Sequence, residues 1–167
     1  MTTDIENLKI RPIVSQDRQK VYDFFRSLGE EGGTFFNRNN GNENRTYSYL
    51  DGGLPDHIFW ALTVKDESDD KIVGMVFLWR KDTGVPWLGI GISEHYKGKH
   101  LGRRLMSHAR AYAEEKGAGG IMLTTAVTNY RGQGLYERMG YEKLGNYKDG
   151  EFLYLLTLNN KGEAQDS

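Results

Sequence analysis

The sequence lacks cysteine altogether, which excludes disulfide bonds, thiolate metal sites and a cysteine nucleophile. Its four histidines do not have the spacing of a zinc site, so we expect no bound metal. No apolar run approaches the roughly 20 residues that a membrane span needs. The first ten residues also lack the apolar core of a signal peptide, and we therefore expect a soluble, cytoplasmic protein without a membrane partner.

An excess of charge of one sign is missing as well. The 167 residues include 22 lysines and arginines against 23 aspartates and glutamates, which gives a formal net charge of −1. Proteins built to grip nucleic acid carry a basic excess, so the composition argues against a nucleic-acid partner. The length indicates one domain with an ordinary core.

Alternating or continuous apolar runs predict strands, and apolar residues at helical spacing predict helices. Strands are predicted at 8–14, 57–66, 71–81, 87–92, 121–127, 141–147 and 151–158, and helices at about 15–28, 98–116 and 129–140. Residues 29–56 are rich in glycine and asparagine, and we interpret them as a long loop with a short helix near 34–37. The order of elements predicts a mixed sheet with helices packed on it, in a single domain over 1–158 with a polar, disordered tail at 159–167.

A basic stretch, HYKGKHLGRRL, connects the predicted strand at 87–92 to the helix that follows it, and Gly98 and Gly102 bracket its cations. A glycine-rich turn before a helix presents unpaired N–H groups and the positive end of the helix dipole, so phosphate groups bind there. The stretch matches neither the P-loop nor the dinucleotide-binding pattern. It could equally be an ordinary turn with a solvated basic first helical turn.

The surrounding residues, ISEHYKGKHLGRRLM, resemble the acyl-CoA pyrophosphate motif of the GNAT superfamily of N-acetyltransferases, written R/Q-x-x-G-x-G/A. The motif falls on residues 97–102. Lys97 stands at the Arg/Gln position, and His100 replaces the first motif glycine. A residue other than glycine at this position needs a permitted φ, although its backbone N–H remains available to a ligand.

A second stretch, TNYRGQGLYERMGYEKL, resembles the family pattern N-x-x-A-x-x-L-Y-x-x-x-G-F. Its marked positions are occupied by Asn129, Leu135, Tyr136, Gly140 and Tyr141, with Gly132 in place of the alanine. The resemblance covers almost the whole chain. It implies an α/β (α+β) fold with a GNAT-like mixed, mostly antiparallel central sheet of about seven strands flanked by about four helices.

The resemblance further implies transfer of an acyl group, usually acetyl, from acetyl-CoA as co-substrate to a primary amine of a small molecule or peptide, by direct attack in a ternary complex. The implied cofactor-binding residues are Ile90, Gly91, Ile92, Lys97, Gly98, Lys99, His100, Leu101, Gly102, Arg103 and Asn129. The fourth strand would pair with the amides of the pantetheine arm, and the turn would hold the pyrophosphate. Asn129 could also cap the following helix.

Tyr136 stands at the position of the family's general acid, which protonates the departing CoA thiolate. The alternative is a buried tyrosine that packs under the sheet. The general base is not identified, because relatives carry a glutamate near the start of the fourth strand or at the position of Thr124, and neither carboxylate is present. The nearby candidates are Glu94 and His95, the distant ones are His57, Glu30, Glu31 and Asp51, and ordered water could serve equally.

The resemblance also implies that residues 29–56 line the acceptor side. Their aromatic residues, which could equally belong to the core, include Phe35, Phe36, Tyr47 and Tyr49. The sequence chooses neither the acceptor nor the acyl chain. A catalytically silent CoA-binding module is the alternative function, and a nucleotide binder is a third. The oligomeric state stays open, although the closing hairpin could pair across a homodimer.

Overall fold

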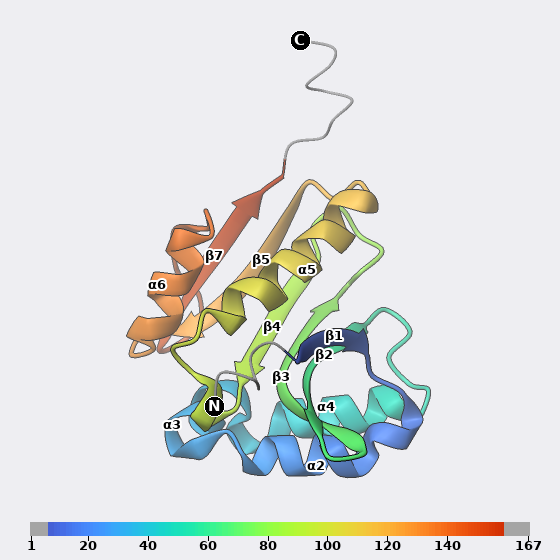
Figure 1. The fold of residues 1–167 in the computed structure, drawn as a ribbon. Helices are drawn as coiled ribbons and strands as arrows, with labels where there is room; N and C mark the ends of the chain where they lie inside the picture. Colours follow the sequence, from blue (N-terminus) through green and yellow to red (C-terminus); the bar gives the residue numbers. More distant parts are fainter. Residues whose placement is uncertain (1–6, 159–167) are drawn as a thin grey trace.

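The computed structural model describes residues 7–158, and the tail expected at 159–167 lies outside them. Seven strands form one sheet in the order β1-β2-β3-β4-β5-β7-β6 (Figure 1). The strands are β1 (Leu8–Pro12), β2 (Ile58–Asp66), β3 (Asp69–Trp79), β4 (Trp87–Ile92), β5 (Gly120–Ala126), β6 (Glu142–Asn146) and β7 (Glu151–Thr157). The α-helices are α2 (Arg18–Arg26), α3 (Gly29–Phe36), α4 (Gly41–Leu50), α5 (Leu101–Glu115) and α6 (Tyr130–Arg138).

Neighbouring strands run antiparallel everywhere except between β4 and β5, which are parallel. Parallel neighbours need a crossover connection, and α5 supplies it. The predicted mixed, mostly antiparallel sheet of about seven strands is therefore confirmed. β6 forms one edge of the sheet, and its pairing across a homodimer stays a prediction. Within the described chain, no helix combines the length and apolar character needed to cross a membrane.

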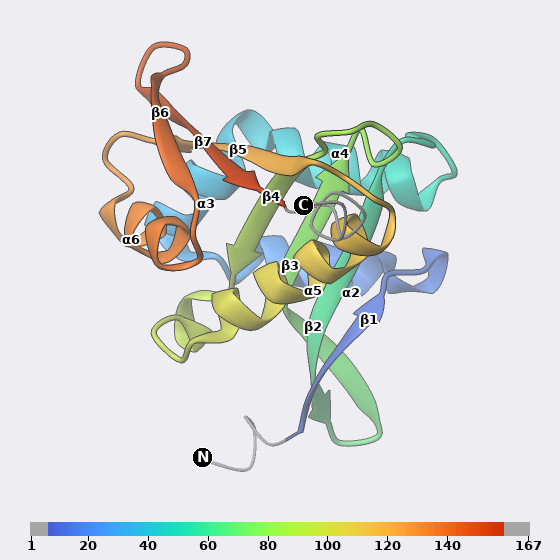
Figure 2. The ribbon, with the colours of Figure 1, turned by 90° about the horizontal axis from the view of Figure 1, so that it is seen from above.

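Helices cover both faces of the sheet, and each face has its own core. α5 and α6 cover one face, where Leu78, Leu105 and Ile121 are completely buried. α2, α3 and α4 cover the other face, over an aromatic cluster that includes Phe24 and Phe59. Figure 2 shows α5 on one side of the sheet and α3 and α4 on the other.

The interpretation of residues 29–56 as a long loop is wrong, because α3 and α4 occupy most of them. Glycine and asparagine lower helix propensity, but tertiary contacts override a weak local preference. The ring of Phe36 is buried and stacks on Phe25 with the ring centroids 5.8 Å apart. On α4 the buried carboxylate of Glu43 pairs with Arg26 and accepts a hydrogen bond of 2.6 Å from Tyr47.

Two glycines of β4 bring aromatic rings down to the level of the strand backbone. A Cβ at Gly89 would lie 2.4 Å from the ring of Phe77, and one at Gly91 would lie 2.5 Å from the ring of Phe36. Both rings are buried, so neither can swing aside into solvent. On this face, rings from β3 and α3 therefore lie over Gly89 and Gly91 of β4, where these residues have no side chains of their own.

We expect Gly89→Ala to destabilise the protein by about 1–3 kcal/mol, because the new methyl group overpacks the core against Phe77. The free energy of unfolding from urea denaturation measures this loss. Gly84→Ala is the control, since a Cβ there meets no atom within 4 Å, and its cost should stay within about 0.5 kcal/mol. Equal stability of the two variants would contradict the close packing of Phe77 on β4.

Candidate functional site

The sheet opens between its two parallel strands. β4 and β5 are paired at a single position, Trp87 opposite Met122, near the start of β4. Beyond it the strands diverge toward their carboxyl ends, as Figure 1 shows. One edge of β4, from Ile90 to Ile92, is consequently left without a partner strand. Its free N–H and C=O groups can pair with an extended ligand as a further strand would.

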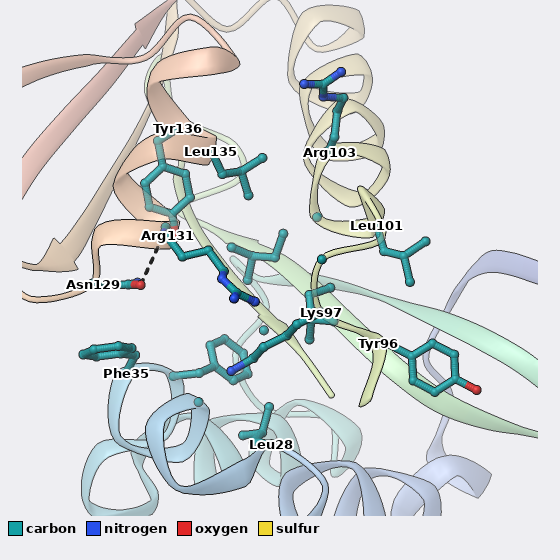
Figure 3. Close-up of a pocket in the computed structure, with 18 of the residues that line it drawn as sticks. Leu28, Phe35, Tyr96, Lys97, Leu101, Arg103, Asn129, Arg131, Leu135 and Tyr136 are labelled. Atoms are coloured by element: carbon teal, nitrogen blue, oxygen red, sulfur yellow. Dashed lines mark hydrogen bonds between the residues drawn. The ribbon is translucent and has the colours of Figure 1, made fainter. Parts of the chain in front are cut away.

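A cleft of about 420 Å³ fills this opening (Figure 3). Its walls come from α3, β4, the turn before α5, and α6. The structure places the predicted cofactor-binding residues around the cleft, with one exception. Lining residues are Ile90, Gly91, Ile92, Lys97, Gly98, His100, Leu101, Gly102, Arg103 and Asn129, together with Tyr136. The exception is Lys99, which is exposed and does not line the cleft.

Sequence reasoning did not assign several lining residues to the site. They are Leu28, Gly32, Tyr96, Arg131, Gly132, Leu135 and Arg138. Leu28 lies between α2 and α3, at the end of the helix predicted over 15–28, and Gly32 lies on α3, in the segment interpreted as a loop. Arg131 lies two residues after Asn129, inside the second motif. Its position on the first turn of α6 could have been inferred from the motif.

The turn before α5 keeps a conformation that usually requires glycine. Gly98 has φ 77°, and His100 has φ 62° and ψ 20°, in the left-handed region that histidine tolerates better than most residues. The predicted helix at 98–116 accordingly begins later, at Leu101. The backbone N–H groups of residues 98–102 find no acceptor among residues 7–158. Such a row of free N–H groups at a helix N-terminus suits a phosphate.

Cations approach the cleft from two walls. Figure 3 shows Lys97 and Arg131 extending toward each other across the cleft, whereas Arg103 points away from both. The ammonium of Lys97 also lies 3.2 Å from a carboxylate oxygen of Glu94. The basic character of the cleft thus comes partly from α6, which the turn motif alone does not indicate.

The base candidates are scattered over the structure. Glu31 lines the cleft but is exposed to solvent, while Glu94 is paired with Lys97. His57 is buried, and its Nδ1 lies 2.7 Å from Asp56. Asp51 pairs with Arg18 on the surface, and Glu30 and His95 are exposed and do not line the cleft.

Tyr136 is buried on α6 and faces the cleft. Burial raises the pKa of Tyr136 to about 12, although a hydrogen bond with Thr125 acts in the opposite direction. Its ring packs edge-on against Tyr154, with centroids 5.8 Å apart. The phenol therefore keeps its proton at neutral and moderately alkaline pH and can donate it to a group in the cleft.

Asn129 caps α6 and is held at both ends of its amide. Its Oδ1 accepts a hydrogen bond of 3.1 Å from the N–H of Gly132 (Figure 3), and its Nδ2 donates one of 3.0 Å to Thr125. A Cβ at Gly132 would lie 2.4 Å from Nδ2, so an alanine here would require the Asn129 amide to shift. The capping role is confirmed, and contact with a cofactor stays a prediction. The Thr125 hydroxyl that accepts from Asn129 also acts to lower the pKa of Tyr136.

Comparison with known proteins identifies the family. Residues 18–141 match the family model described as the acetyltransferase (GNAT) family, and the chain belongs to this family. A Bacillus subtilis (strain 168) protein, provisionally named ribosomal protein bS18-alanine N-acetyltransferase, is 30% identical over 83 residues, which cover 50% of this chain and 55% of that protein. N-acetyltransferase family 8 member 3 of Rattus norvegicus is 27% identical over 97 residues, covering 53% of this chain and 40% of that protein. The matches thus span about half the length of these relatives.

Solved structures share the whole fold. The GNAT domain of S. lividans PAT superposes with a TM-score of 0.76 at 16% identity, and the match covers 90% of each chain. The PaiA N-acetyltransferase of Thermoplasma acidophilum, solved in complex with coenzyme A, gives a TM-score of 0.73 at 16% identity and covers 90% of this chain and 99% of that one. At such low identity these likenesses establish the fold and nothing finer.

We expect Asn129→Ala to cost about 1 kcal/mol of stability, because the N–H of Gly132 loses its cap. The matched variant Asn129→Asp keeps the accepting oxygen and places a negative charge at the positive end of α6, so it should retain most of the stability. Urea denaturation of the two variants measures the difference. An equal loss of unfolding free energy in the two variants would contradict the capping role. It would indicate that Asn129 stabilises the protein through its hydrogen bond with Thr125.

Proposed function

We propose that this protein transfers an acetyl group from acetyl-CoA to a primary amine of a small molecule or peptide, by direct attack in a ternary complex with Tyr136 as general acid. One observation carries the proposal: the cleft between β4 and β5 joins the free N–H groups of the turn to the buried phenol of Tyr136. Membership of the acetyltransferase family supports it. The fold shared with a relative solved in complex with coenzyme A supports the choice of cofactor.

The residues present fit acetyl-CoA, which when bound supplies a thioester carbonyl activated for attack by an amine. The N–H groups of residues 98–102 would hold the pyrophosphate, with Lys97 and Arg131 adding positive charge. The free edge of β4 at 90–92 would pair with the amides of the pantetheine arm. A backbone N–H of this edge would also stabilise the oxyanion that develops during attack.

Tyr136 would act on the leaving group. Its Oη donates a hydrogen bond to the sulfur as negative charge develops there and then transfers its proton to the thiolate. The phenolate left behind is stabilised by the hydrogen bond with Thr125, which favours the charged form. The incoming ammonium loses one proton to solvent in this proposal, because Glu31, the base candidate on the cleft, is itself exposed. The nitrogen loses a second proton after the C–N bond has formed, and transfer of this proton through solvent to the Tyr136 phenolate restores the acid.

We expect Gly102→Val to weaken acetyl-CoA binding about tenfold or more, because the added side chain enters the cleft at the first turn of α5. Calorimetric titration with acetyl-CoA measures the affinity, with ATP as the control ligand. A Cβ at Gly102 would also lie 2.9 Å from Leu135. The double variant Gly102→Val/Leu135→Ala relieves this internal contact. Affinity that returns in the double variant would contradict direct obstruction of the ligand.

We expect Tyr136→Phe to keep the affinity for acetyl-CoA and to lower kcat by about 10²–10⁴-fold, since only the proton donor is lost. Turnover is measured by thiol release with a panel of primary amines. Tyr141→Phe is the matched control, because the buried hydroxyl of Tyr141 has no hydrogen-bond partner among the described residues and does not line the cleft. Its turnover should equal that of the wild type.

Three results would count against this assignment. Equal turnover of the Tyr136 and Tyr141 variants would remove Tyr136 as the acid. A fall of the wild-type kcat at alkaline pH that persists unchanged in Tyr136→Phe would show that a group other than this phenol controls the rate there. Binding of acetyl-CoA without turnover of any amine would favour the alternative of a catalytically silent CoA-binding module.

A further inference from the structure

One half-buried arginine, Arg45, has no ionic partner among the described residues. Three arginines of residues 7–158 are half-buried, namely Arg11, Arg45 and Arg110. Arg11 pairs with two aspartates at 2.8 and 3.0 Å, and Arg110 pairs with a glutamate at 3.3 Å. Arg45 forms neither an ion pair nor a hydrogen bond with any described residue. Burying a guanidinium without a partner is costly, so its place on α4 needs an explanation.

The guanidinium of Arg45 lies against two aromatic rings of β3. Its central carbon is 5.2 Å from the ring centroid of Phe77 and 5.5 Å from that of Trp79. Burial lowers the pKa of Arg45, and the charge of Asp56 only opposes this effect without forming a pair. The rings offset part of the lost hydration, but the five N–H donors of the side chain remain available.

Arg45 lies over the face of β4 that also carries Phe36, a residue that lines the cleft. Alternate residues of a strand share a face, so Trp87, Gly89 and Gly91 point the same way. Gly91 lies under Phe36, a residue of the cleft, and Gly89 lies under Phe77. Arg45 therefore lies one step along β4 beyond the end of the cleft. It belongs to α4, which Figure 2 shows on the face of the sheet opposite α5.

An apolar strip continues from this cation. The rings of Trp79 and Trp87 are 5.4 Å apart, and those of Trp87 and Tyr147 are 5.9 Å apart. The two tryptophans are half-buried, and Tyr147 is 38% exposed, so the strip is open to solvent at its end. A ligand lying on the strip would place an apolar body on indole rings and a charged group at Arg45.

A second unpartnered nitrogen lies against the same two rings. The ring of His57 stacks on Phe77 and Trp79 with centroids 6.3 and 6.4 Å away. Its Nε2 is buried and has no hydrogen-bond partner among the described residues. The same patch thus holds an unpaired cation and an unpaired nitrogen, and the ring of Phe77 that both contact lies over Gly89, two residues before Gly91 of the cleft.

We propose that Arg45 binds the carboxylate of the acceptor, so that the acceptor is an α-amino acid or short peptide with an apolar side chain and a free carboxylate. The planar fork of a guanidinium matches a carboxylate through two parallel hydrogen bonds. The apolar side chain would lie on Trp79 and Trp87, and the amine would point along β4 toward the cleft. This inference rests on the proposed acetyl transfer and names its substrate class.

Binding of product analogues tests Arg45 without requiring turnover. The protein, saturated with coenzyme A, is titrated with N-acetyl-L-phenylalanine and with its C-terminal amide, which differ only in the charge at the carboxyl end. We expect the wild type to bind the acid about tenfold or more tightly than the amide. Arg45→Gln should bring the two affinities within about twofold, and Arg45→Lys, a point charge, should keep an intermediate preference.

Arg80→Gln is the matched control for loss of one positive charge. The guanidinium of Arg80 also lies 5.5 Å from the ring centroid of Trp79, but the residue is exposed. The preference of this variant for the acid should equal that of the wild type. Thermal denaturation of both glutamine variants verifies that they are folded.

A kinetic arm compares kcat/KM for L-phenylalanine and glycyl-L-phenylalanine with that for the corresponding amides. We expect the free acids to be preferred, although the amine of phenylalaninamide is less basic and more often neutral, and Arg45→Gln should abolish the preference. Equal affinity of the wild type for acid and amide, absence of binding of both, or an unchanged preference in Arg45→Gln would overturn the proposal.

The two proposals fail separately. If acetyl-CoA and coenzyme A do not bind, acetyl transfer is refuted, and the same titration of the free protein still shows whether Arg45 selects a carboxylate. If acetyl-CoA binds and amines are acetylated without any dependence on a carboxylate or on Arg45, acetyl transfer stands and the substrate class is wrong.

Discussion

The site depends on the sheet being joined between β4 and β5 at one residue pair only. Had the two strands stayed in register, the free edge of β4 would be consumed by hydrogen bonds to β5 and no cleft would exist. The crossover helix α5 must begin where β4 ends, so its unpaired N–H groups face the opening. α6 follows β5 on the opposite side of this opening, and its residue Tyr136 lines the same cleft. A single gap in the ladder thereby gathers a strand edge, a helix N-terminus and a phenol.

The two faces of β4 serve different purposes. Toward α5 the strand presents Leu88, Ile90 and Ile92, which pack in the core. Toward α3 and α4 it presents two glycines, and rings from other elements settle on its backbone. A row of aromatic rings therefore extends along β4 from Phe36 at the cleft, past the buried Phe77, to Trp87 and Tyr147, and its far end is open to solvent. The cofactor is expected at the strand edge and the acceptor on this aromatic face, so the two would meet without competing for the same contacts.

The parts of the molecule that the sequence predicts are those specified by neighbouring residues. The strands, the turn at 97–102 and the position of Tyr136 depend on local patterns, and the structure brings them to one cleft. Residues 29–56 were misinterpreted because α3 and α4 are stabilised by distant contacts such as Phe36 with Phe25, which no local propensity records. The isolation of Arg45 is harder still to foresee. The isolation arises because the fold brings no carboxylate of the described residues into pairing distance of Arg45, and this depends on the arrangement of all the elements around α4.

The left-handed turn at His100 also bears on which sequences can build such a cleft. A phosphate bound as proposed would meet a backbone N–H at this position, and the chain must only hold φ near 62° to present it. Asparagine and aspartate tolerate that region about as readily as histidine, whereas valine or isoleucine would be strongly disfavoured there. The position therefore constrains a dihedral angle and leaves the side chain free to vary within a small polar set. A sequence pattern that requires glycine at this position would miss every chain that forms the same turn with another residue.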